Sequence, residues 1–300
     1  MRLGRVQRRP REAGVALLLA VWVLALLAVI GGELIASGRV RYFTELNRRD
    51  ELRGLALALA GYHDALAALE KVIGLQWDED KKQLLLKFPD NTEGIPATRE
   101  NVPLGDGTFS WRIEDEDGRV NINTIPRSQL VDLLQECGME FGVDRDTVAD
   151  SILDWVDETD SKKLNGAEEQ EYQALTPPYS CKDGEFDVVE ELLLVRGVTR
   201  EIFEGGEVDG KKRPGMRDLV TTFVPQGTKV NLATAPEEVL KAMKLARTAT
   251  LTQSNNFSII ATGYPGGSDQ SRSLRAVVRR DTGSKPPFIL LYWNDNYSPG

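Results

Sequence analysis

The sequence contains very few of the residues on which zinc sites and hydrolase active sites depend. Its 300 residues include a single histidine, His63, and two cysteines, Cys137 and Cys181. A structural zinc site needs about four cysteine or histidine ligands, and serine or cysteine hydrolases normally need a histidine base. The composition therefore disfavours both classes. The two cysteines are either buried apolar side chains or, if this part of the chain is exported, a Cys137–Cys181 disulfide.

Acidic residues outnumber basic residues in most of the chain. The formal net charge is -9, yet the first fourteen residues carry +4, so the remaining residues carry -13. The basic residues of this leader are Arg2, Arg5, Arg8, Arg9 and Arg11. An acidic body repels phosphate backbones, which argues against a nucleic-acid partner, and it suits cations that bind oxygen.

An uncharged run follows the basic leader directly. Val15–Gly32 contains eighteen uncharged residues, and a helix of that length spans roughly 27 Å, close to the ~30 Å hydrocarbon core of a bilayer. A cleaved secretory signal has a shorter apolar region, and Glu33 interrupts the run where a small-residue cleavage site is needed. We therefore expect a retained transmembrane helix over residues 15–36.

The helical pattern continues beyond the membrane segment. Asp50–Leu75 keeps apolar residues on one stripe with charged residues between them, and neither segment contains proline. The pattern predicts one helix from about residue 15 to 75, roughly 90 Å long. A helix placed half in lipid and half in a soluble domain usually packs against copies of itself or its relatives.

The leader that ends in glycine and the apolar helix after it resemble the signal of type IV pilins and pseudopilins. The sequence Glu12-Ala13-Gly14-Val15-Ala16-Leu17-Leu18 is similar to the K-type minor pseudopilins of type II secretion systems. The resemblance implies that a prepilin peptidase cuts after Gly14 and that Val15 becomes a methylated N-terminus. Most pilins have glutamate as the fifth mature residue, where this chain has Leu19. Absence of this acid is characteristic of the K type, whose tip position has no subunit above it.

Short strands are predicted on both sides of a helical region. The strands are Lys82–Phe88, Thr108–Ile113, Phe257–Thr262, Leu274–Asp281 and Phe288–Trp293. Between them, helical periodicity marks Ser128–Cys137, Arg145–Val156, Val188–Val195 and Pro236–Met243. We predict an α+β, pilin-like protein whose antiparallel sheet is interrupted by a large, mostly helical insertion. The expected parts are a leader (1–14), a transmembrane helix (15–36), the first part of the pilin-like domain (37–117), the inserted domain (118–248) and C-terminal strands (249–300).

Two motifs in the insertion indicate architecture. Val120–Pro126 recurs as Val230–Pro236, and the threonine two residues before each proline is predicted to cap the following helix, with Glu237 completing a capping box in the second copy. Glu190–Thr199 resembles a helix-hairpin-helix turn. The DNA-binding form usually carries a second glycine where Thr199 stands, with basic neighbours, so the acidic surroundings favour a purely structural hairpin.

An acidic segment is the strongest candidate for chemistry. Asp154, Asp157 and Asp160 stand three residues apart at a predicted helix end, and Glu168 and Glu171 follow. Converging carboxylates repel one another and favour an oxygen-loving cation such as calcium. Asp157 to Glu168 has the length of a twelve-residue calcium loop, but Lys162 stands where an EF-hand requires glycine. From the residues alone, a solvated acidic loop is an equal alternative.

The same segment also resembles the calcium-binding inserted domain of the K-type family, in which DWxDxxD is followed by GAExxxY. The resemblance implies Asp154, Asp157, Asp160 and Glu168 as calcium ligands, with Glu171 as a further candidate.

The family resemblance implies a structural role and no enzymatic activity. The chain would cap the tip of the type II secretion pseudopilus and help initiate its assembly, for export of folded proteins from the periplasm. The implied partners are the I-type and J-type minor pseudopilins, the major pseudopilin, the prepilin peptidase and the bacterial inner membrane, with the body in the periplasm. Two alternatives are a membrane-anchored metal-dependent enzyme and a helix-hairpin-helix DNA receptor. The scarcity of histidine opposes the first alternative, and the net charge of -13 opposes the second.

Overall fold

The N-terminal part of the chain is a single long helix. The computed structural model describes residues 10–159, 161–208, 210–248, 253–281, 283–285 and 287–298. Its contacts divide the chain into one unit that ends at Arg53 and a compact unit that begins at Gly54. Helix α1 (Pro10–Lys71) confirms the long uninterrupted helix. Among the described residues, α1 is the one helix long and apolar enough to cross a membrane, and its apolar side chains from Val15 to Ile30 are exposed.

Two antiparallel sheets follow α1. The smaller sheet has the order β1–β2–β3, with strands Gly74–Asp78, Gln83–Phe88 and Asn91–Pro96. The larger sheet has the order β12–β11–β10–β5–β4. Its strands in chain order are β4 (Thr98–Leu104), β5 (Gly107–Asp115), β10 (Asn256–Tyr264), β11 (Arg272–Arg280) and β12 (Phe288–Tyr297).

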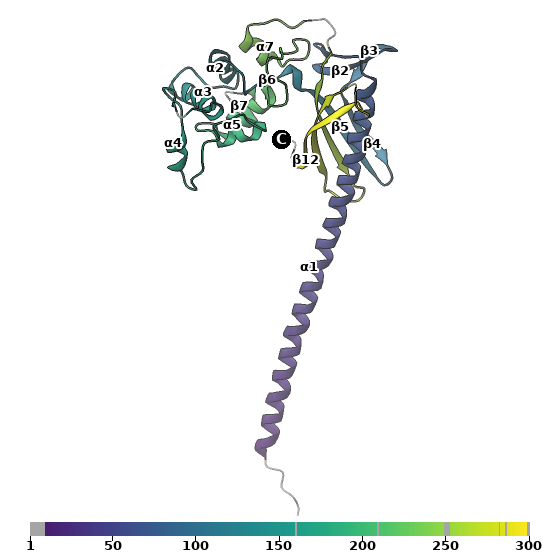
Figure 1. The fold of residues 1–300 in the computed structure, drawn as a ribbon. Helices are drawn as coiled ribbons and strands as arrows, with labels where there is room; N and C mark the ends of the chain where they lie inside the picture. Colours follow the sequence, from purple (N-terminus) through teal and green to yellow (C-terminus); the bar gives the residue numbers. More distant parts are fainter. Residues whose placement is uncertain are drawn as a thin grey trace, which may run out of the picture. The chain divides into compact units, whose positions relative to one another are not determined.

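The larger sheet pairs strands that lie on either side of the insertion in the sequence. Strand β5 pairs antiparallel with β10 without a register shift, and Ile113 lies opposite Ile259, 146 residues later in the chain. The predicted split sheet is therefore confirmed. Figure 1 shows β5 and β12 gathered beside the last turns of α1, while helices α2 to α5 lie in a separate lobe.

Small residues bring α1 close to the sheet. A Cβ atom on Gly263 of β10 would lie 2.1 Å from the carbonyl oxygen of Gly54, and a Cβ on Gly61 would lie 3.1 Å from Phe109. Larger apolar side chains fill the space around these contacts, among them Leu57, Tyr62, Leu69, Trp111, Ile259, Leu274 and Val278. Burial of one such side chain stabilises the fold by ~1.5–3 kcal/mol, so the close approach that glycine allows is what lets this core form.

The inserted lobe has its own core. Its helices are η1 (Glu116–Gly118), α2 (Arg127–Glu136), α3 (Val143–Val156), α4 (Glu169–Gln173), η2 (Val189–Leu194), α5 (Arg200–Glu204), α6 (Met216–Leu219) and α7 (Glu237–Met243). Its buried side chains include Leu130, Ile152, Trp155, Tyr172, Leu192, Met216 and Leu240. The segment predicted as helix at Val188–Val195 is a 3-10 helix. The lobe also holds strands, which the helical periodicity did not predict: β6 (Val120–Asn121) pairs in parallel with β9 (Val220–Thr221), and β7 (Gly205–Val208) forms a hairpin with β8 (Lys211–Pro214).

The repeated motif forms two matching turns. Oδ1 of Asn121 accepts from the backbone N–H of Asn123 at 2.8 Å, and Oδ1 of Asn231 accepts from that of Ala233 at 3.1 Å. These are asparagine turns, in which the side chain imitates a backbone turn. The motif is therefore architectural, as predicted, and asparagine rather than threonine organises it.

The predicted threonine caps are wrong. The residue before the first helical turn is Pro126 in α2 and Pro236 in α7, two residues after Thr124 and Thr234, so neither threonine stands at the cap position. The hydroxyl of Thr234 instead donates to Oδ2 of Asp115 at 2.5 Å, and Glu237 pairs with Lys241 at 2.8 Å. The hydroxyl that the capping pattern assigned to the helix end thus donates a hydrogen bond to a buried carboxylate instead.

A polar joint connects the two ends of the lobe to the sheet. Oδ2 of Asp117 accepts from the backbone N–H of Asn255 at 2.6 Å, and the carbonyl oxygen of Asp117 accepts from Asn231 N–H at 2.7 Å. Asp115 is buried, and burial raises its pKa to about 7 although Ser254 and Thr234 donate hydrogen bonds to it. The beginning of the lobe is therefore fixed both to its end and to β10.

Candidate metal centre

The last turn of α3 and the loop after it place two of the predicted ligands together. Asp154 is fully buried on α3, and Asp157 ends the helix. Nζ of Lys163 lies 3.0 Å from Oδ1 of Asp154 and 2.5 Å from Oδ2 of Asp157. A Cβ atom on Gly166 would lie only 1.7 Å from Oδ2 of Asp154, so glycine is required for the loop to close over this carboxylate.

Glu168 is the third predicted ligand in the cluster. It is 8% exposed, and Oε1 has no hydrogen-bond partner among the described residues. Burial first, and then the nearby carboxylates of Asp154, Asp183 and Asp157, raise the pKa of Glu168 to about 7 against the opposing effect of Lys163. A buried acid without a partner, surrounded by other acids, is a group that a cation would stabilise.

Asp183 is a member of the cluster that sequence reasoning missed. The backbone N–H of Gly184 donates to the carbonyl oxygen of Trp155 at 3.1 Å, which brings the loop of Asp183 to the end of α3. Within the described part of the chain, Oδ1 of Asp183 is buried and lacks a hydrogen-bond partner. One ligand atom each from Glu168, Cys181 and Asp183 lie within 4.8 Å of one another. Asp183-Gly184 signals only a turn in the sequence, because the contact depends on tertiary folding.

Glu171, a further predicted ligand, is not brought to the cluster. The carboxylate of Glu171 lies 2.5 Å from Nζ of Lys162 and accepts from the backbone N–H of Glu168 at 3.0 Å. These hydrogen bonds hold the pKa of Glu171 below its ordinary value. Glu171 therefore caps α4, where sequence reasoning expected a ligand. Asp160 lies outside the described residues.

The loop is held from the other side by Asp150. Its Oδ2 accepts from the backbone N–H of Asn165 at 3.3 Å, and its Oδ1 lies 2.5 Å from Nε of Arg127. Trp155 packs edge-on against Tyr172 with ring centres 5.2 Å apart, which forms an apolar wall behind the acids. An apolar wall lowers the local dielectric constant, so charges in the cluster interact more strongly than they would in water.

The cysteines do not form the predicted disulfide. Cys137 and Cys181 are both free and buried. Burial raises the pKa of each thiol to about 12. The charges that act on Cys137 come from Asp218 and Glu238, whereas those on Cys181 come from Asp183 and Glu168, so the thiols occupy different surroundings.

The cluster suits a cation held by oxygen. Asp154, Asp157, Glu168 and Asp183 bring four carboxylates together with one ammonium, that of Lys163. Two carboxylate oxygens, Oε1 of Glu168 and Oδ1 of Asp183, are buried without a hydrogen bond from the described residues. Calcium prefers six to eight oxygen ligands from carboxylates, carbonyls and water, and the donor set present here fits that preference.

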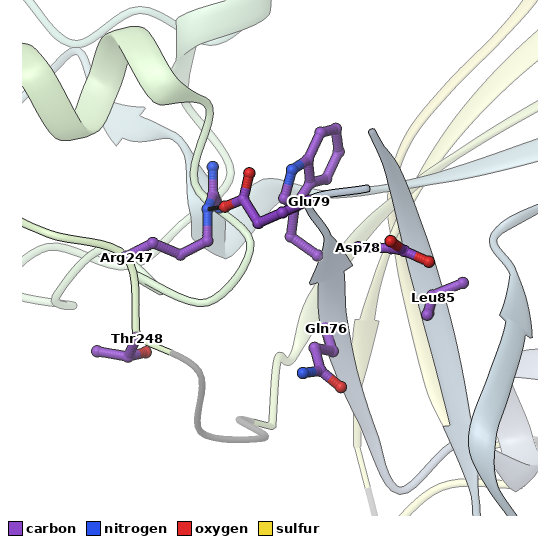
Figure 2. Close-up of a pocket in the computed structure, with 7 residues that line it drawn as sticks. Gln76, Asp78, Glu79, Leu85, Arg247 and Thr248 are labelled. Carbon is purple, nitrogen blue, oxygen red and sulfur yellow. Dashed lines mark ion pairs between the residues drawn. The ribbon is translucent and has the colours of Figure 1, made fainter. Parts of the chain in front are cut away.

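A pocket away from the acidic cluster lies where the lobe meets β1. It is lined by Gln76, Trp77, Asp78, Glu79, Leu85, Arg247 and Thr248 (Figure 2). Nε of Arg247 lies 2.5 Å from Oε1 of Glu79, and its guanidinium lies 5.5 Å from the centre of the Trp77 ring. Arg247 also donates to the carbonyl oxygen of Ala235 at 2.8 Å. Its charge is thus used to hold the two sides of the pocket together.

Known proteins are similar to this chain in sequence and in fold. The family model for type II secretion system protein K matches residues 112–205. The putative type II secretion system protein K of Escherichia coli K12 is 26% identical over 212 residues, which are 64% of this chain and 60% of that protein. The protein K of Pseudomonas aeruginosa is 26% identical over 248 residues, 78% of this chain and 69% of that protein. The match spans about 60% of the length of the E. coli and Aeromonas hydrophila relatives.

A solved structure matches over more of the chain. A chain in the crystal structure of the GspK-GspI-GspJ complex from enterotoxigenic Escherichia coli superposes with a TM-score of 0.60 and 17% identity, and the match covers 87% of this chain and all of that one. A long N-terminal helix, an antiparallel sheet and a helical lobe inserted between β5 and β10 define a pilin-like protein with a large insertion. The chain is thus similar to type II secretion system protein K, the K-type minor pseudopilins, in sequence over residues 112–205 and in overall fold.

Proposed function

We propose that this chain caps the tip of the type II secretion pseudopilus and helps to initiate its assembly. The observation that carries the proposal is the uninterrupted β5–β10 register, because it adds a lobe of more than a hundred residues to an intact pilin-like sheet. A lobe of this size would block addition of another subunit above it. Leu19, in place of an acid, fits a subunit that has no N-terminal amine above it to pair with.

The proposed partners are other pseudopilins. The similar solved chain is part of a GspK-GspI-GspJ complex, which supports I-type and J-type minor pseudopilins as partners at the tip. The major pseudopilin would lie below them in the filament. The apolar residues of α1 would anchor the chain in the inner membrane with the body in the periplasm. A prepilin peptidase would cut after Gly14 and leave Val15 as the methylated N-terminus.

The tip role is tested in cells that lack their own protein K. Full-length chain should restore secretion, co-purify in detergent with I-type and J-type pseudopilins, and cross-link as one copy per filament. A matched variant in which residues 118–248 are replaced by a short turn keeps β5 and β10 and should lose the restriction to one copy. Many copies of the full-length chain along each filament would contradict the proposal.

Calcium is the proposed ligand of the acidic cluster. Asp154, Asp157, Glu168 and Asp183 would hold the ion, which would supply positive charge to acids that otherwise repel one another. The lobe would then be more stable where calcium is available. The buried, unpartnered oxygens of Glu168 and Asp183 support this proposal.

A further inference from the structure

We propose that Glu168, Cys181 and Asp183 form a site for a thiophilic divalent cation, of the Zn²⁺ or Cd²⁺ class. The site shares two carboxylates with the proposed calcium centre but does not depend on calcium binding there. Its distinguishing feature is a sulfur atom, which calcium does not use as a ligand.

The geometry brings the three ligand atoms together. They lie within 4.8 Å of one another, and the side chains of Glu168 and Cys181 are more than nine-tenths buried. Zinc bonds of ~2.3 Å to sulfur and ~2.0–2.2 Å to oxygen place tetrahedral ligand atoms roughly 3.3–3.8 Å apart. The separations therefore have to close by at most about 1–1.5 Å to reach tetrahedral zinc geometry.

Unsatisfied atoms point to a ligand at this place. Oε1 of Glu168 and Oδ1 of Asp183 are buried and accept no hydrogen bond within the described part of the chain. The loop that carries Cys181 is fixed independently, because the backbone N–H of Cys181 donates to Oε2 of Glu169 at 2.9 Å. The thiol is thus held beside two carboxylates, each with one buried oxygen that accepts no hydrogen bond from the described residues.

The sulfur sets the metal preference. When the cation binds, the S–H bond of Cys181 breaks, its proton passes to water, and a sulfur–metal bond forms without oxidation of either partner. Thiolate ligands favour zinc and cadmium over calcium and magnesium. Two carboxylates and one thiolate supply three of the four ligands of a tetrahedral zinc site, and water would supply the fourth.

The test is a cadmium titration of the full-length chain in detergent, reduced and freed of metal. One equivalent of Cd²⁺ should produce the ultraviolet sulfur-to-cadmium charge-transfer absorption. Cys181→Ser should abolish this absorption, and Glu168→Gln should weaken binding at least tenfold. Cys137→Ser is the matched control and should keep the absorption, because Cys137 lies beside Asp218 and Glu238 instead. Absence of the absorption in the wild-type chain, or its persistence in Cys181→Ser, would overturn the proposal.

A second measurement tests the site on the wild-type chain, in case Cys181→Ser fails to fold. In the wild-type chain, Zn²⁺ should slow maleimide labelling of Cys181 at least tenfold, located by mass spectrometry, and leave labelling of Cys137 unchanged. Equal protection of both thiols would contradict the site. The calcium proposal is judged separately: Cys181→Ser should keep any calcium-dependent rise in melting temperature. A cadmium signal without any calcium effect would refute the calcium centre and leave this site standing.

Discussion

Nζ of Lys163 lies 2.5 Å from Oδ2 of Asp157 at the end of α3, so the chain supplies its own cation to the acidic cluster. The same ammonium lies 3.0 Å from buried Asp154. A metal ion bound by both carboxylates would have to displace this lysine. Lys163 therefore competes with calcium for the same oxygens.

Lys163→Gln should bind calcium about tenfold more tightly, because the competing charge is gone, a change equivalent to ~1.4 kcal/mol. Without calcium the variant should lose about 1–3 kcal/mol of stability, since removal of one partner leaves a buried carboxylate unpaired and the lysine is only partly buried. Calorimetry and thermal melting measure the two effects. Lys162→Gln, which changes a lysine paired with Glu171, is the control and should leave calcium affinity unchanged. An unchanged affinity in Lys163→Gln would show that the lysine does not compete.

Calcium should raise the melting temperature of the wild-type chain relative to chelator. At a hundredfold excess over the dissociation constant, mass action adds about 2.7 kcal/mol, and magnesium should substitute poorly because it demands a tighter octahedron. Asp157→Ala and Glu168→Ala should each reduce the rise, whereas Glu204→Ala, paired with Arg200 outside the cluster, should not. Identical melting with calcium and chelator would mean that the acidic loop is solvated surface.

Asp115 should make stability depend on pH. Because burial raises its pKa to about 7 in the folded chain, above the ordinary value of 3.8, the folded state binds the proton more tightly than the unfolded state. Its stabilising contribution is full below about pH 4 and is lost as pH rises through 7, by roughly 2–4 kcal/mol. Unfolding in urea from pH 5 to 8, in excess calcium to keep Glu168 ionised, measures this slope. Asp115→Asn should flatten the slope and exposed Asp269→Asn should keep it; a slope of the opposite sign would refute the assignment.

Gly263→Ala should strongly destabilise the packing of α1 on the sheet. The added Cβ would lie 2.1 Å from a backbone carbonyl oxygen, which cannot move aside as a flexible side chain can. We expect a loss of about 3 kcal/mol or more, at the upper end of overpacking effects. Gly206→Ala is the control, because no described atom lies within 4 Å of its added Cβ, and it should change stability by at most about 0.5 kcal/mol. Thermal melting compares the two, and equal melting temperatures would contradict the close contact.

Processing should remove the basic leader. Intact-mass analysis of membrane-extracted protein should show the loss of fourteen residues and the gain of one methyl group at Val15. Gly14→Val, which removes the small residue before the cut, should leave the leader attached. A mature chain that begins after residue 30 would indicate a conventional signal peptide.

Periodicity predicted most of the fold because it reports which face of an element is buried. It placed α1, α2, α3 and the strands β5, β10 and β11 within a few residues. Capping rules failed at Thr234 because the buried carboxylate of Asp115, 119 residues earlier in the chain, competes for its hydroxyl. The acidic cluster was predicted only where its members are close in sequence. Asp183 joins it through the Gly184–Trp155 backbone hydrogen bond, a tertiary contact that no local pattern encodes.

The pairing of β5 with β10 also sets an order of folding. Asp115 and Phe257 are partners 142 residues apart, and closure of a flexible loop of that length costs entropy that grows with its logarithm. A lobe that has already folded ties Asp117 to Asn231, so only a short stretch is left to close. The sheet therefore assembles most readily on a finished lobe, and whatever stabilises the lobe also speeds completion of the body that carries it.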